Sequence, residues 1–220
     1  MLTNKFFSAK ILVMDKKNAR IYIQGIINSV ERDVVAAIGA FNNHNAVNKN
    51  KIGFFAVPRM IFPEIDCLGC LYCGNLATSK NSVTFMRKYF SQVNILYKHI
   101  SGFLYMTYRH GLMHQHEPKN VELKQQNFFW QISMNHPTFH LKFRQPYNHL
   151  VLDGSKFLSD FLESARIYLN DFEIDQGNVF LENFNKALGE MIKPNSESKM
   201  NKLGEKYSIQ SDLNFLKKQI

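Results

Sequence analysis

The stretch that decides the fold covers residues 128–169 and reads FFWQISMNHPTFHLKFRQPYNHLVLDGSKFLSDFLESARIYL. Apolar and polar side chains alternate over residues 128–134 and again over 139–143, which is the period of a strand. Turn residues around Pro146 then lead into a third short apolar run. This pattern predicts a small antiparallel meander of two or three strands at about residues 128–152.

The pattern becomes helical after Asp153. Apolar residues recur at intervals of three and four immediately beyond it and again over residues 179–191, and Asp is a favourable residue just before a helix. The end of the chain loses this periodicity. We therefore predict one helical domain over residues 1–192 and a tail over residues 193–220, which is partly disordered or forms a short helix around Leu213.

The first half of the chain also has helical spacing. It predicts a long helix over residues 18–43 and a second over residues 63–78, with a proline in its first turn. Ser82 is expected to cap a third helix, and residues 95–114 either continue that helix or start a fourth. Gly111 together with Pro118 is expected to end the helical path. The predicted fold class is mainly α (α+β): a bundle of four or more helices with a small β insertion.

Composition excludes several classes of protein. With 220 residues, of which 45% are hydrophobic, the chain can bury a core. Its most apolar stretch, residues 52–74, contains three charged residues and two prolines, which a bilayer would penalise. The apolar run at residues 11–14 is too short for a signal peptide. We expect no membrane partner, a cytoplasmic location and reduced cysteines.

Two groups of side chains in the predicted second helix could act as ligands. Cys67, Cys70 and Cys73 have a spacing that suits zinc or an iron–sulfur cluster only if a fourth ligand lies near, so we interpret them as packing residues and expect no metal or cofactor. The carboxylates of this helix, among them Asp66, can form an ion pair with Arg59 or Arg109, or can serve as helix N-terminal charges.

Positive charge is concentrated in the middle of the chain. Residues 80–124 contain seven Lys and Arg against two acidic residues. Clustered positive charge attracts phosphates, which makes RNA or a nucleotide a candidate partner, although a basic surface can also serve solubility alone. The candidate nucleic-acid-binding residues are Lys119, Arg87, Lys88 and Lys98.

Within this basic segment, residues 108–119 read YRHGLMHQHEPK and contain three histidines. Four residues separate Arg109 from His114, and six separate it from His116. A histidine can take the proton from a ribose 2′-hydroxyl or protonate the leaving oxygen, because it titrates near neutrality. An arginine can neutralise the charge that builds up on the phosphorane. Together they can cleave RNA without a metal ion.

The sequence Arg109-His110-Gly-Leu-Met-His114 resembles the signature of the HEPN superfamily of helical proteins, an arginine followed after four to six residues by histidine, often with a polar residue second. The resemblance implies a metal-independent endoribonuclease, in some members a toxin or defence component, whose two motifs face each other across a homodimer. It implies Arg109 and His114 as the catalytic pair, with His110 or His116 in support. The strands depart from a compact HEPN bundle.

A non-catalytic interpretation stands beside this one. Arginine and histidine near a helix C-terminus can cap the last carbonyls, so Arg109 and His114 could be structural residues of a protein that forms a homodimer or binds a partner. On a regular helix Arg109 and His116 share a face, while His114 lies about 140° away unless Gly111 breaks the helix. The same spacing at Arg144 and His149 falls on a proline turn and is expected to be irrelevant.

Overall fold

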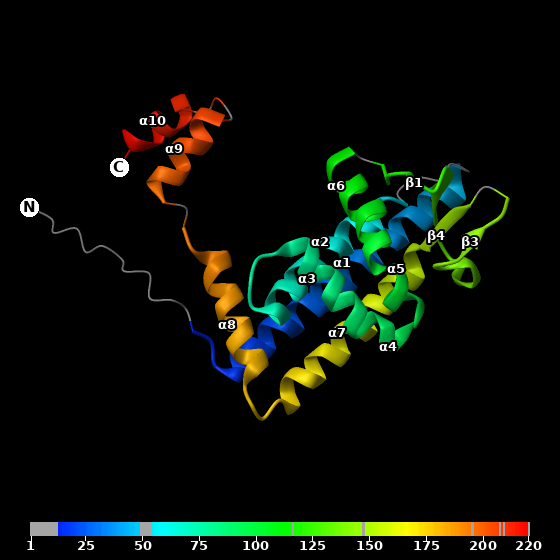
Figure 1. The fold of residues 1–220 in the computed structure, drawn as a ribbon, viewed down its shortest axis with the longest axis horizontal. Helices are drawn as coiled ribbons and strands as arrows, with labels where there is room; N and C mark the ends of the chain where they lie inside the picture. Colours follow the sequence, from blue (N-terminus) through cyan, green and yellow to red (C-terminus); the bar gives the residue numbers. More distant parts are fainter. Residues whose placement is uncertain are drawn as a thin grey trace, which may run out of the picture.

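A computed structural model of the chain is mainly helical, with a small sheet at one side (Figure 1). It describes residues 13–48, 54–115, 117–146, 148–194, 196–206, 208 and 210–219. No helix in these ranges is long and apolar enough to cross a membrane.

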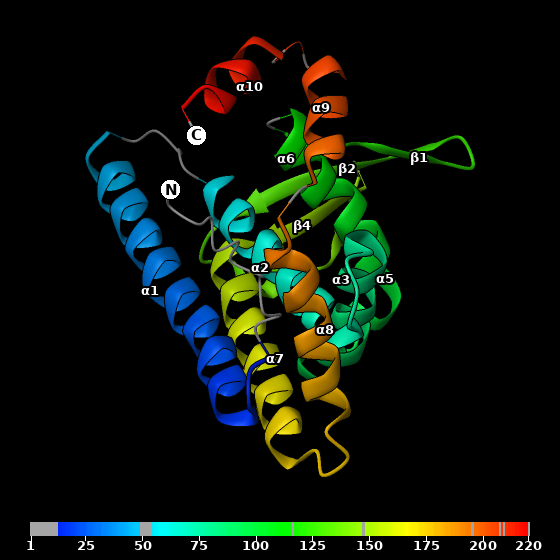
Figure 2. The same cartoon turned by 90° about the vertical axis from the view of Figure 1, so that its left-hand side faces the viewer.

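The long helices form because one stripe of each is apolar. Helix α1 (Lys16–Asn48) buries Ala19, Ile23, Ile27, Val30 and Val34 against α7 (Gly154–Ile174) and α2 (Ala56–Cys73). Helix α8 (Val179–Ile192) packs on α2. Figure 2 shows α1 and α7 side by side. The predictions of α1 and of the two helices after Asp153 are confirmed, and the Asp153 carboxylate accepts from the backbone N–H of Lys156.

The second helix does not lie where the sequence predicted it. Helix α2 begins at Ala56 and ends at Cys73, so Pro63 lies inside the helix rather than in its first turn. Gly74 terminates α2 with a left-handed φ of 72°, which glycine adopts without strain, and donates to the carbonyl of Cys70. Ser82 was also misplaced: it lies within α3 (Thr78–Phe85) instead of capping it.

The chain from α3 to residue 115 winds through several short helical segments. A π-helical turn η1 (Met86–Phe90) and α4 (Ser91–Val93) follow α3, and the extended backbone of Asn94 then separates them from α5 (Leu96–Leu104). The run of residues 95–114 therefore starts a new helix. It continues through a second π-helical turn, η2 (Tyr105–His110), into α6 (Gly111–Gln115). The helical path therefore passes through Gly111 and ends before Pro118, so the predicted end is correct for Pro118 and wrong for Gly111.

The predicted antiparallel meander is wrong in topology, because the sheet is mixed and has four strands. Strands β1 (Val121–Leu123), β2 (Gln126–Ser133), β3 (Phe143–Arg144) and β4 (His149–Asp153) lie in the order β1-β2-β4-β3. Strand β4 inserts between β2 and β3 and runs parallel to β2, with Gln131 opposite Val151. Residues 137–139 form a 3-10 turn, which includes the first residue of the alternating run predicted over residues 139–143. Alternation predicts strands but not which strands pair.

One face of the sheet packs on the helices and the other does not. Ile132, Leu150 and Leu152 belong to the main core, whereas Val151 points to the opposite face. The buried hydroxyl of Tyr108 fastens η2 to the sheet by donating to the carbonyl of Leu150 at 2.8 Å. The sheet is thus anchored next to Arg109.

The end of the chain contains two helices. Helix α9 (Glu197–Lys206) was not predicted, and α10 (Gln210–Lys217) forms around Leu213 as expected. The two pack on each other, where a side chain at Gly204 would approach Leu213 to 2.7 Å. Figure 1 places the pair beyond the end of α8.

Candidate functional site

Arg109 lies on η2 and is held by an acidic residue of α2. Its Nε donates to Oδ2 of Asp66 at 3.0 Å, and its Nη2 lies 2.9 Å from the same oxygen. Both side chains are largely buried, with 21% of the Arg109 side chain and 11% of the Asp66 side chain exposed. The interpretation of Asp66 as the ion-pair partner of Arg109 is confirmed.

The other oxygen of Asp66 is bound as well. Oδ1 accepts from the hydroxyl of Ser82 at 2.6 Å and from the hydroxyl of Tyr105 at 3.0 Å. The guanidinium of Arg109 also lies over the Tyr105 ring, 5.7 Å from its centroid. Burial raises the pKa of Tyr105, so its hydroxyl stays protonated and remains a donor to the carboxylate. We call Asp66, Ser82, Tyr105 and Arg109 the Asp66 cluster.

The π-helical turn and the loop after α6 shape this end of the molecule. The N–H of Lys119 donates to the carbonyl of Thr107 at 2.8 Å, which folds the loop back on η2. Gly111 permits this approach, because a side chain there would come within 2.6 Å of the Lys119 nitrogen. π-helical turns are rare and often occur at functional sites. The fold therefore brings Lys119 to the helical turn of Arg109.

The predicted histidines lie around the same helix end. His110 is half-buried, with its ring 5.3 Å from the Tyr105 ring in an edge-on arrangement. His114 lies on α6, which continues from η2 without a break, so Gly111 does not break the helix between Arg109 and residue 114. The prediction that used His116 falls outside the described residues.

The other candidate nucleic-acid-binding residues are exposed but spread out. Arg87 and Lys88 lie on η1, and the Arg87 guanidinium is 3.8 Å from the position of a Cβ on Gly102. Lys98 lies near the start of α5, eleven residues before Arg109, which is roughly 16 Å along a helix at 1.5 Å per residue. Of the four predicted residues, Lys119 is the one that the backbone brings to η2.

The cysteines of α2 behave as packing residues. Cys70 is buried, and Asn81 Nδ2 lies 3.7 Å from its sulfur. Burial, with a further effect of nearby Glu64, raises the pKa of Cys67 to about 12. Within the ranges that the structure describes, no three His, Cys, Asp or Glu side chains gather as metal ligands would.

The sequence did not reveal a second buried carboxylate, Asp160 of α7. Its Oδ2 accepts from Tyr97 at 3.0 Å and lies 3.2 Å from His140 Nε2, and Lys156 donates to Oδ1 at 2.6 Å. His140 was interpreted as a polar residue of an alternating strand, but it is buried after the 3-10 turn. We call Tyr97, His140, Lys156 and Asp160 the Asp160 cluster. The i,i+4 spacing of Lys156 and Asp160 was its only local signal in the sequence.

The His140 ring has a defined tautomer in this cluster. The N–H of Asp153 donates to Nδ1 of His140 at 3.1 Å, so the ring proton of the neutral form resides on Nε2, facing Asp160. Burial opposes ionisation of Asp160, but the hydrogen bonds from His140 and Lys156 outweigh it and lower the pKa of this carboxyl group. The cluster joins α5, the loop before β3 and α7, and its role is structural.

Comparisons of the chain with protein-family models, with curated proteins and with solved structures gave no match. The arrangement of side chains is therefore the basis for assigning a function.

Proposed function

We propose that the chain is a HEPN-like RNA-binding protein with metal-independent endoribonuclease activity at the helix end formed by η2 and α6. The observation that supports this most is the ion pair of Arg109 with Asp66. It fixes a partly exposed guanidinium in one orientation beside the helix that carries His114. Fixing a cation before substrate arrives lowers the cost of stabilising a charged transition state.

In this proposal each group has one role. Arg109 neutralises the charge on the pentavalent phosphorus, and His114 exchanges the proton of the 2′-hydroxyl or of the leaving oxygen. Lys119 attracts the neighbouring phosphate, since its backbone lies against η2. His110 packs on Tyr105 and helps to hold the turn in place. As the resemblance to the HEPN superfamily implies, we propose that a homodimer brings two copies of this motif to face each other.

One observation favours a second candidate function. The Asp66 carboxylate balances the charge of Arg109, as expected if the arginine fastens η2 to α2 and has no further role. The protein would then be a non-catalytic helical protein that forms a homodimer or binds a partner through its exposed basic residues.

Cleavage of single-stranded RNA in excess chelator separates the two candidates. We expect cleavage by the wild-type protein, because neither the charge neutralisation nor the proton transfer requires an ion. His114→Ala should lower the rate by about 10²- to 10⁴-fold, which is typical for loss of a general acid or base. The matched control is His149→Ala, which removes the histidine of the second Arg-x4-His sequence at the start of β4. No cleavage by the wild-type protein, or full activity of His114→Ala, would leave the non-catalytic candidate.

The catalytic role of Arg109 is tested better by a conservative substitution than by alanine. Arg109→Ala would leave Asp66 buried without its cation. Breaking a buried pair costs about 3–5 kcal/mol. Arg109→Lys retains the charge and the ion pair while losing the planar fork, so activity should fall while unfolding by urea changes much less. Equal loss in RNA cleavage and in stability would assign Arg109 to structure alone.

A further inference from the structure

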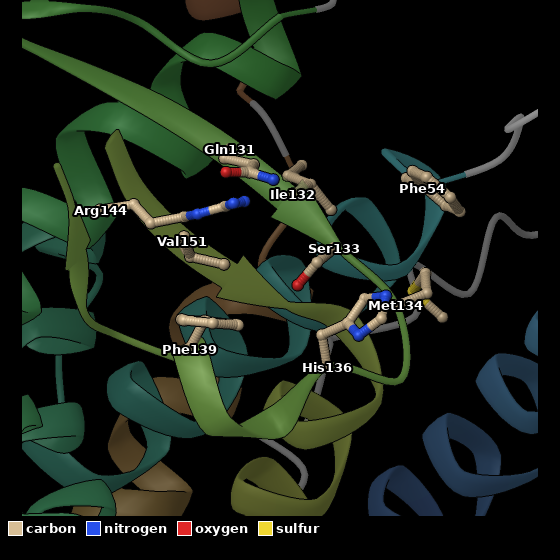
Figure 3. A pocket seen from close by; sticks show the side chains of 9 residues that line it. All are labelled: Phe54, Gln131, Ile132, Ser133, Met134, His136, Phe139, Arg144 and Val151. Carbon is tan, nitrogen blue, oxygen red and sulfur yellow. The ribbon is translucent and has the colours of Figure 1, made fainter. Parts of the chain in front are cut away.

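The outer face of the sheet carries a pocket that the Arg109 site does not use. It has a volume of about 450 Å³, within the range of small-molecule sites. Figure 3 shows Arg144 and Gln131 extending over the sheet on one side, Ser133 near the centre, and His136 with Phe54 toward the other side. The remaining lining residues are Ile132, Met134, Phe139 and Val151.

The charged end of the pocket is built around Arg144 of β3. Its guanidinium lies over the ring of Phe139, 5.4 Å from the centroid, and makes no hydrogen bond or ion pair with any of the described residues. The amide of Gln131 lies close by in Figure 3. A planar cation supported by an aromatic ring presents its donors in a fork that fits phosphate or carboxylate oxygens.

The floor of the pocket adds hydrogen-bond acceptors but little unbalanced charge. The Ser133 hydroxyl donates to Oδ2 of Asp153 at 3.0 Å, so it can offer its lone pairs to a ligand. That carboxylate also accepts from the backbone N–H of His136 at 2.7 Å and, at the start of α7, from the N–H of Lys156. Three donors and the positive end of a helix offset the charge of Asp153, which lies fully buried. Arg144 and His136 are the cation-forming side chains that line the pocket.

The opposite end of the pocket suits a flat ring. Phe54 and Met134 form an apolar wall, and the His136 imidazole stands beside Met134 in Figure 3. Aromatic and imidazole rings stack on heteroaromatic bases without selecting one base. The ligand that fits both ends joins an anionic group to a flat ring.

We propose that this pocket binds a nucleoside monophosphate, with its phosphate on Arg144 and its base between Phe54 and His136. The inference goes beyond the ribonuclease proposal and does not depend on it, because none of the lining residues belongs to the Asp66 cluster or to α6. A free mononucleotide and the 5′-phosphorylated end of an RNA strand offer the same chemistry.

Calorimetric titration of the full chain with adenosine 5′-monophosphate tests the proposal. We expect binding that is at least about tenfold tighter than that of inorganic phosphate or adenosine alone, because each of these fills one end of the pocket. Arg144→Ala should weaken it about tenfold or more, as loss of a hydrogen bond to a charged group does. Lys142→Ala is the matched control, because Lys142 lies exposed two residues before Arg144 but does not line the pocket.

Arg144 is exposed, so its removal should leave the circular dichroism spectrum unchanged. No detectable binding of the mononucleotide, equal binding by Arg144→Ala, or an equal loss in Lys142→Ala would overturn the assignment. A short 5′-phosphorylated RNA decides the source of the ligand: competition with the mononucleotide identifies an RNA end, and lack of competition identifies a free nucleotide.

Discussion

Two buried carboxylates, in the Asp66 and Asp160 clusters, solve the same physical problem in different ways. Each accepts from a tyrosine hydroxyl and pairs with a cation. Asp160 is fully buried and joins three segments of the chain, whereas the side chain of Asp66 is 11% exposed and holds an arginine at a helix end. The comparison teaches that a buried ion pair can either fasten the interior or orient a charged group near the surface.

The largest expected effect is on the stability of variants that lack one of the two carboxylates. We expect Asp160→Ala to lower the free energy of unfolding by about 3 kcal/mol, because it leaves the buried side chains of Tyr97 and His140 without their acceptor, at about 1–3 kcal/mol each. Asp66→Ala should cost less, because Ser82 keeps its hydrogen bond to the carbonyl of Thr78 and only Tyr105 is left as a buried hydroxyl without its acceptor. Urea unfolding of the two variants measures the difference, and an equal or reversed order would contradict the division between interior and surface.

A smaller effect should distinguish the two tyrosines. Tyr97→Phe removes a hydroxyl that contacts both Asp160 and His140, and should cost about 1–3 kcal/mol, as expected when a buried partner is left unsatisfied. Tyr105→Phe leaves Asp66 with Ser82 and Arg109, so a cost of about 1 kcal/mol is expected. Thermal unfolding of this matched pair checks the order. A larger loss for Tyr105→Phe would show that the Asp66 cluster is the more tightly coupled one.

The smallest effect concerns pH. Because the pKa of Asp160 is lowered in the folded state, its contribution to stability is present above the unfolded value of about 3.9 and is lost as pH falls through the folded value. The stability difference between the wild-type protein and Asp160→Asn should therefore be constant from pH 7 to 5 and shrink below about pH 4. Urea midpoints across this range measure it. A difference that stays constant to pH 3 would contradict the assigned ion pair.

The sequence predicted more of the helices than of the sheet. Helix α1 and the helices after Asp153 follow from apolar spacing, since a helix buries one stripe whatever lies opposite it. The parallel pairing of β2 with β4 could not be predicted, because an alternating strand buries the same face beside a parallel or an antiparallel neighbour. The ends of α2 were misplaced because its apolar stripe extends on both sides of Pro63.

The candidate site was predicted in part. Arg109 and its pairing with Asp66 were among the interpretations that the sequence offered, because few carboxylates lie in the apolar part of the chain. The Asp160 cluster was missed because its members come from separate segments, and His140 resembles a solvent-facing strand residue until the 3-10 turn buries it. The pocket was missed because its lining residues also come from separate segments, and Arg144 was interpreted only as part of a proline turn.

By itself, the sequence determined the long helices α1, α7 and α8, the change of period after Asp153, and the gathering of basic residues between residues 80 and 124. These properties depend on neighbours within a few positions, and spacing records them directly. Only the tertiary structure decided the order of the strands, the partners of Asp66 and Asp160, and the pocket over β2 and β4. Each of these joins residues far apart in the chain, and local propensity carries no information about which distant groups will meet.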